Sequence, residues 1–116
     1  MSDVATDSHG VVVVLTTVPD RETGERLAGT LVDERRVACG NLVDGVTSIY
    51  RWEGAVETAR ELLLLLKTRH ELVPAVFERV AQLHPYEVPE LVVLPVDAVS
   101  HAYSRWVREE TTEVIA

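Results

Sequence analysis

Runs of apolar residues in the middle of the chain predict a long β-hairpin. Residues 38–68 read ACGNLVDGVTSIYRWEGAVETARELLLLLKT. The predicted strand at 37–52 is rich in β-branched and aromatic side chains over 46–52, and the predicted strand at 56–67 contains five consecutive leucines at 62–66. Successive side chains of a strand point to opposite sides, so the leucine run is apolar on both faces. We predict two long antiparallel strands joined near Glu53 and Gly54, the second of which needs a cover on each face.

Two further strands and a helix are predicted around this hairpin. The β-branched run VVVVLTT at 11–17 is typical of a buried strand, and 91–96 supplies another short one. Between the first strand and the hairpin, apolar residues recur at helical spacing over about 21–36, with Asp20 as a plausible N-cap. The glycines within the second strand, Gly40 among them, predict a bulge or a close backbone approach.

The second half of the chain predicts two more helices. Thr68 and Glu71 match the capping-box pattern, and the apolar stripe that follows predicts a helix whose first turn is irregular or kinked at Pro74. Ser100 can cap a final helix. The inner face of that final helix is expected to be Tyr103, Trp106 and Val107.

The order β, α, β, β, α, β, α defines the predicted fold class. The first six elements are the α+β, ferredoxin-like βαββαβ arrangement, here with a long hairpin and an extra C-terminal helix. Two helices cover only one face of such a sheet, so the leucine run predicts an obligate homo-oligomer that covers the other face. We expect residues 1–9 to be a disordered tail and residues 10–112 to form one domain.

Composition narrows the possible partners and location. A 47% hydrophobic and 26% charged chain of 116 residues is typical of a single soluble domain. The net charge of −8, without a basic cluster, argues against nucleic-acid binding. No apolar run approaches membrane-spanning length and no signal peptide is evident, so we expect a cytoplasmic protein without a membrane partner. Cys39 is the only cysteine, which excludes an intrachain disulfide.

Several separated motifs resemble one known family. They are ACGN at 38–41, SIYRWEG at 48–54, ELLLLLKT at 61–68, HPYEVPE at 84–90 and YSRW at 103–106. In this order they closely resemble the CutA divalent-ion tolerance family, from about Val11 to Glu110. The resemblance implies a ferredoxin-like protomer, a homotrimer with interlocking strands, and an architecture similar to the PII signalling proteins. It also implies binding of Cu(II) or another divalent cation, with a role in metal tolerance; no organic cofactor is predicted.

Three side chains are candidate metal ligands: His84, Cys39 and Glu90. The imidazole of His84 opens a turn and can bind a transition metal, although a histidine at a helix end can instead bond to free carbonyls. At the start of a strand, Cys39 is more often a small buried apolar residue than a ligand. Glu90 can instead cap a strand edge or pair with an arginine. Some relatives have a histidine and a cysteine where this chain has Leu83 and Thr16, so we expect weaker copper binding or different ligands.

A second set of residues is a candidate for a small-molecule cleft. Tyr50, Trp52 and Tyr86 could line a cleft between subunits, where pockets often form, or could simply pack an interface. Lys67 is the only lysine, which suggests either a ligand contact or compositional bias with a salt bridge.

These observations leave three functional hypotheses. The leading one is a metal-binding homotrimer, and the second is a PII-like regulatory or scaffold trimer that holds a small molecule or protein in its inter-subunit clefts. The third is a small hydrolase that pairs Arg21 or Arg51 with Asn41, as acylphosphatases on this scaffold pair such residues. The chain has no nucleophile–base pair, glycine-rich phosphate loop or HExxH motif, so we expect no enzymatic activity.

Overall fold

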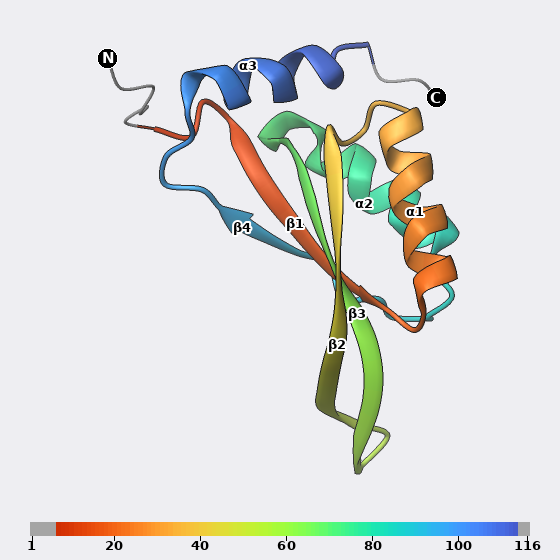
Figure 1. Cartoon of the computed structure of the whole chain (residues 1–116). Helices are drawn as coiled ribbons and strands as arrows, with labels where there is room; N and C mark the ends of the chain where they lie inside the picture. The colour runs from red at the N-terminus through yellow and green to blue at the C-terminus, as the bar shows by residue number, and fades with distance from the viewer. Residues whose placement is uncertain (1–6, 114–116) are drawn as a thin grey trace.

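The chain folds as an α+β protein of the ferredoxin-like type, as predicted. The computed structural model describes residues 7–113. The elements are β1 (Val11–Val18), α1 (Arg21–Asp33), β2 (Cys39–Trp52), β3 (Ala55–Arg69), the 3-10 helix η1 (His70–Leu72), α2 (Val73–Leu83), β4 (Val92–Pro95) and α3 (His101–Glu110) (Figure 1). All neighbouring strands are antiparallel in the order β2-β3-β1-β4. The long hairpin and the additional C-terminal helix are therefore confirmed.

Helices α1 and α2 cover one face of the sheet (Figure 1). Every second leucine of the run, at positions 62, 64 and 66, is buried on that face. The core that they enter also contains Val14, Val18, Leu27, Leu31, Val37, Val76 and Val80. Alternation along β3 thus places three of the five leucines in the protomer core.

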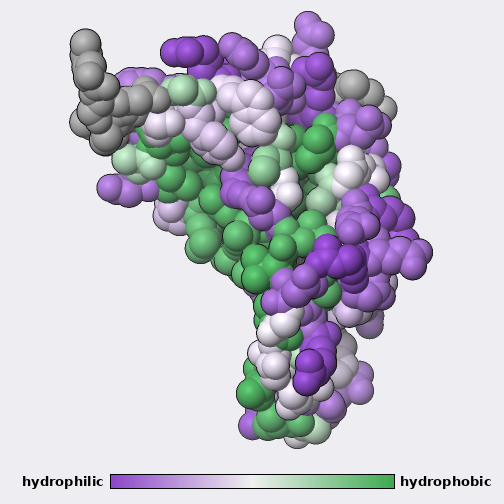
Figure 2. Space-filling view, in the orientation of Figure 1, coloured by the Kyte–Doolittle hydropathy of each residue, from purple (hydrophilic) through white to green (hydrophobic). Residues whose placement is uncertain are grey.

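The opposite face of the sheet, here called the open sheet face, is apolar and mostly uncovered. It consists of Val13, Leu15, Val43, Leu63, Leu65, Val92 and Leu94, which alternate with the core residues in the strand registers. Leu63 and Leu65 are half-buried, whereas Val43 and Leu94 are each 42% exposed. Figure 2 shows this hydrophobic area between α3 and the tip of the hairpin. One face of the leucine run therefore lacks a cover within the protomer.

The hairpin of β2 and β3 projects well beyond the helices (Figure 1). Its strand pairing shifts between Val43 and Val46, where Gly45 has a φ of +77°. A bulge with glycine in this conformation bends a strand, as the sequence predicts. At Gly40 the backbone of β2 approaches α1 closely, which is the other role predicted for these glycines. A Cβ at this position would lie 3.0 Å from the Cβ of Ala28 on α1.

Two of the three predicted helix caps are confirmed. The carboxylate of Asp20 accepts a hydrogen bond from the backbone N–H of Thr23 at 2.8 Å, which lowers the pKa of Asp20. The hydroxyl of Ser100 accepts from the N–H of Tyr103 in the same way, at 3.2 Å.

Helix α1 ends at Asp33 rather than at the predicted residue 36. Arg35 has a φ of +61°, which is incompatible with a continuing helix.

The predicted capping box at Thr68 and Glu71 is wrong. Thr68 belongs to β3, where its side chain is buried and donates to the carbonyl of Arg36 at 2.7 Å. Strand pairing with β1 continues to Arg69, so this segment cannot start a helix. A single 3-10 turn follows, and α2 begins at Val73 with Pro74 in its first turn. The irregular helix start predicted from Pro74 is therefore confirmed.

The predicted inner face of α3 is only partly correct. Val107 is fully buried against Val11 and Ala38, but Tyr103 and Trp106 are 38% and 41% exposed. Helix α3 lies across one end of the sheet (Figure 1), and its buried residues are Ser104 and Val107. Its short contact buries only one narrow stripe, which leaves both aromatic rings at the surface.

Residues 7–9, which we expected to belong to a disordered tail, are hydrogen-bonded to the rest of the protein. The carbonyl of Asp7 accepts from the N–H of Val99 at 3.1 Å, and the carbonyl of His9 accepts from Arg108 at 3.1 Å. The remainder of that predicted tail, residues 1–6, lies outside the described residues. Within the described part of the chain, no helix is long and apolar enough to cross a membrane.

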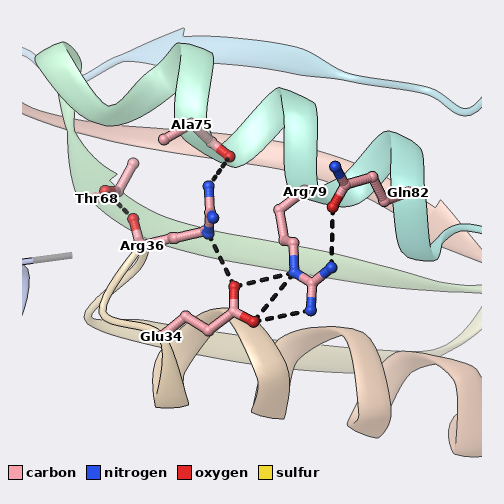
Figure 3. A network of polar contacts seen from close by, with 6 residues as sticks. All are labelled: Glu34, Arg36, Thr68, Ala75, Arg79 and Gln82. Atoms are coloured by element: carbon pink, nitrogen blue, oxygen red, sulfur yellow. Dashed lines mark hydrogen bonds and ion pairs between the residues drawn. The ribbon is translucent and has the colours of Figure 1, made fainter. Parts of the chain in front are cut away.

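A polar network joins the end of α1 to α2 (Figure 3). The carboxylate of Glu34 accepts from Arg79 at 2.8 to 3.1 Å and from Arg36 at 2.9 Å. Arg36 also donates to the carbonyl of Ala75 at 2.9 Å, and its own carbonyl accepts from Thr68. The hydrogen bonds from Arg79, followed by those from Arg36, hold the pKa of Glu34 below its usual range.

Replacement of Glu34 by glutamine is expected to lower stability in a pH-dependent way. A carboxyl whose pKa is lower in the folded state stabilises that state above its unfolded pKa, about 4.3 for glutamate. This contribution is lost as the pH falls through the folded-state pKa. The wild type should therefore have a higher Tm than Glu34→Gln at pH 7, and the two values should converge in thermal melts below about pH 4. A Tm difference independent of pH would contradict this role.

Candidate functional site

The segment after α2 fixes His84 through both of its ring nitrogens. His84 is the C-cap residue of α2, and only 7% of it is exposed. Its Nε2 lies 2.7 Å from the carbonyl oxygen of Thr17, and its Nδ1 lies 3.1 Å from the backbone nitrogen of Tyr86. A carbonyl only accepts and a backbone N–H only donates, so His84 carries its proton on Nε2. The ring thereby joins the end of α2 to β1.

The partly buried Tyr86 and the buried Glu61 form the polar centre of the same region. The Tyr86 hydroxyl donates to Oε2 of Glu61 at 2.6 Å, and the Tyr86 ring lies 4.7 Å from that of His84, centroid to centroid. Burial and the carboxylate of Glu61 together raise the pKa of Tyr86. The hydroxyl therefore remains a hydrogen-bond donor to Glu61 at neutral pH.

These residues border a cleft of about 620 Å³ between the hairpin and the segment 84–90. It is lined by Thr17, Ser48, Ile49, Tyr50, Trp52, Glu61, Tyr86, Glu87, Val88, Pro89 and Glu90. The volume is within the range of small-molecule sites. Aromatic and acidic side chains make up much of the lining, and none of the lysine or arginine residues in the described range 7–113 is part of it. The cleft therefore favours a cation over an anion.

Four of the predicted site residues meet at this cleft. Tyr50, Trp52, Tyr86 and Glu90 line it, and His84 supports it through its contacts with Tyr86 and Thr17. His84, Tyr86 and Glu90 lie close together because they belong to one short motif, HPYEVPE. Tyr50 and Trp52 are instead brought to the cleft by the fold of β2.

The two other candidates, Lys67 and Cys39, lie elsewhere in the protomer. They face each other across β2 and β3. Lys67 is six residues along β3 from Glu61, which corresponds to roughly 20 Å at the usual strand rise. The thiol of Cys39 is 3.7 Å from the side-chain oxygen of Asn41. Burial first, and then the nearby thiol of Cys39, raise the pKa of Tyr103 on α3. Within one chain Lys67 therefore does not line this cleft, and its place in a cleft between subunits stays a prediction.

The three predicted metal ligands do not converge within one chain. No three His, Cys, Asp or Glu side chains among residues 7–113 are placed to hold a metal ion together. Both nitrogens of His84 are occupied by hydrogen bonds. Within the described part of the chain, Thr16 is buried with an unpartnered hydroxyl and Leu83 packs against the core. The described residues of one protomer therefore do not form a complete metal site.

The arginine–asparagine pair considered for a hydrolase is not assembled either. Arg21 is paired with Asp44 and with Glu25. Arg51 lies opposite Val56 near the hairpin tip, at the other end of β2 from Asn41. Neither arrangement places a guanidinium beside the amide of Asn41.

Sequence reasoning missed Glu61 and Glu87 as cleft residues. Glu61 is 7% exposed and pairs with Val46 beside the β2 bulge. Its position in the sequence could have indicated this role, because Glu61 is a charged residue directly before the leucine run of a buried strand. Buried carboxylates require specific partners, so such a position points to a polar site.

The fold and the cleft define a ferredoxin-like protein with a long hairpin and a pocket rich in aromatic and acidic side chains. Residues 12–110 match the family model described as CutA1 divalent ion tolerance protein. The chain belongs to this family.

Individual relatives support this family assignment, and the chain covers a different share of each of them. The divalent-cation tolerance protein CutA of Thermus thermophilus is 52% identical, over 85% of this chain and 96% of the relative. The chloroplastic protein CutA 1 of Oryza sativa is 44% identical over 88% of this chain, which spans 58% of that longer relative. A solved structure of the Thermus thermophilus divalent cation tolerance protein (Cut A1) superposes with a TM-score of 0.85 at 50% identity, covering 87% of this chain and 98% of the other.

Proposed function

We propose that the protein acts in divalent-cation tolerance as a cytoplasmic homotrimer. The observation that carries the assembly is the open sheet face, whose apolar side chains remain uncovered by α1, α2 and most of α3. Exposed apolar patches of this extent usually mark an interaction surface. A second copy offers the same apolar chemistry, and closed symmetric assembly is the commonest way to bury it. The role in cation tolerance is supported by membership of the family.

The proposed metal contact of this trimer is the segment from His84 to Glu90. Nδ1 of His84 carries the ring's lone pair, and Glu90 offers a carboxylate at the edge of the cleft. A Cu(II) ion at Nδ1 would compete with the N–H of Tyr86 and would need further ligands from another subunit or from water. This competition is a physical reason to expect weak binding.

Titration with Cu(II) tests this contact. His84→Ala should lose binding that the wild type shows, because it removes the only proposed nitrogen ligand. His70→Ala is the matched control, since His70 is exposed in η1 and lies outside the cleft. Isothermal titration calorimetry should give weaker binding for His84→Ala alone. Equal Cu(II) affinity in the wild type and His84→Ala would exclude the proposed site.

A second candidate function, from a different class, is a PII-like module that binds a small molecule. The observation that favours it is the 620 Å³ cleft, in which Tyr50, Trp52 and Tyr86 meet buried and exposed carboxylates. The cleft also borders the open sheet face, because Thr17 lines it and pairs with Leu63. Ligand binding at this position would be adjacent to the proposed subunit interface, which is where a regulatory ligand can influence assembly.

A further inference from the structure

We propose that the cleft binds an organic cation with protonated amino groups on a short aliphatic chain. The inference rests on the second candidate function, binding of a small molecule in the cleft, and adds the chemical class of that molecule. Its basis is the combination of a buried carboxylate that has no ion-pair partner among residues 7–113, aromatic walls, and further acidic groups in the lining.

The buried carboxylate is Glu61. More than nine-tenths of this residue is buried, yet no lysine, arginine or histidine among residues 7–113 forms an ion pair with it. Its one hydrogen-bond donor in that range is the neutral hydroxyl of Tyr86, at Oε2. A carboxylate removed from water is costly without a compensating positive charge. A ligand ammonium group in the cleft would supply that charge.

The aromatic residues suit the same ligand. Tyr50 and Trp52 come from one strand and Tyr86 from the facing loop, so their side chains flank the cavity from two sides. Tyr50 and Trp52 are 45% and 44% exposed, which leaves much of their surface available to a ligand. Aromatic faces attract ammonium groups, and they also cover the methylene groups between them. An anionic ligand would meet no positive side chain in this lining.

The spacing of the acidic groups favours an organic cation over a metal ion. Glu61, Glu87 and Glu90 all line the cleft, but no three acidic, histidine or cysteine side chains in the described range are placed to share one ion. A small metal ion requires several ligands at about 2.0–2.6 Å. A chain with two ammonium groups can instead contact more than one of these carboxylates, and a cavity of about 620 Å³ has room for it.

Calorimetric titration of the full-length protein with 1,5-diaminopentane tests the proposal. We expect saturable binding of the diamine and none of 1,5-pentanediol, which has the same chain with hydroxyls in place of the ammonium groups. Glu61→Gln keeps an oxygen that can accept from Tyr86 and removes the charge, so the affinity should fall by about tenfold or more. Trp52→Leu should also weaken binding. Glu78→Gln, an exposed site on α2 outside the cleft, should bind as the wild type does.

Several results would overturn the proposal. Equal binding of the diamine and the diol, or unchanged diamine affinity in Glu61→Gln, would show that ligand charge is not recognised. Thermal-shift measurements with nucleotides and organic acids distinguish a wrong ligand class from a cleft that binds no small molecule at all. If such anionic compounds raise the Tm and the diamine does not, the ligand class is wrong while the second candidate function stands. If neither group of compounds raises the Tm, both are wrong.

Discussion

Replacing Leu65 by aspartate is expected to convert the proposed trimer into monomers. Leu65 lies in the middle of the open sheet face, between Leu15 on β1 and Asn41 on β2. In the proposed assembly a second copy covers this position, so the new carboxylate would be buried without a partner. In an isolated protomer the same carboxylate can reach water, because Leu65 is only half-buried there. Sedimentation velocity should show one slower species for Leu65→Asp.

A control separates assembly from folding in this experiment. Val32→Asp introduces the same charge at a residue that is 41% exposed on α1, outside the open sheet face. It should leave the sedimentation coefficient unchanged. Far-UV circular dichroism of Leu65→Asp should still show the mixed helix and strand content of the wild type. A Leu65→Asp protein that sediments like the wild type would mean that this face is not the interface.

Replacing Leu64 by alanine is expected to cost about 2–5 kcal/mol of the free energy of unfolding. Leu64 is 0% exposed and lies in the core between the sheet and the two covering helices. Its loss leaves a cavity that a sheet fixed on both sides by β1 and β2 can fill only partly. Urea unfolding at a fixed protein concentration measures the difference from the wild type.

The conservative variant Leu64→Met provides the comparison for that measurement. It keeps most of the volume and should cost less than about 1.5 kcal/mol. Unlike Leu65→Asp, neither substitution at position 64 should change the oligomeric state of the folded protein, because Leu64 faces the helices. A loss below about 1 kcal/mol for Leu64→Ala would show that the two faces of the leucine run have been assigned incorrectly.

The fold could be predicted because its strongest signals are local and agree with one another. Two β-branched or leucine-rich runs, a turn at Glu53 and Gly54, and helical spacing after Asp20 determine the order of elements. The predictions that were wrong concern features that depend on long-range contacts. Thr68 matches a capping box in sequence, but its pairing with Val12 and its bond to Arg36 keep it in a strand. Local propensity yields to such tertiary contacts.

The candidate site was only partly predictable for the same reason. HPYEVPE is a compact motif, and its His84, Tyr86 and Glu90 do occur together in and around the cleft. Glu61 is contributed by a distant strand, and no sequence spacing links it to Tyr86. Cys39 and Lys67 are chemically distinctive, but the register of β2 and β3 places them toward the other end of the sheet. Chemical type identifies candidates, whereas strand register decides which of them meet.

The mass of the wild-type protein in solution decides whether copies of the chain assemble. In the proposed trimer, the open sheet face is buried by other copies of the chain. Sedimentation equilibrium over a range of protein concentrations should give a mass three times that of one chain, with no dissociation at micromolar concentration. A mass equal to one chain under these conditions would contradict the account, because the apolar face would then be stable in water without a cover.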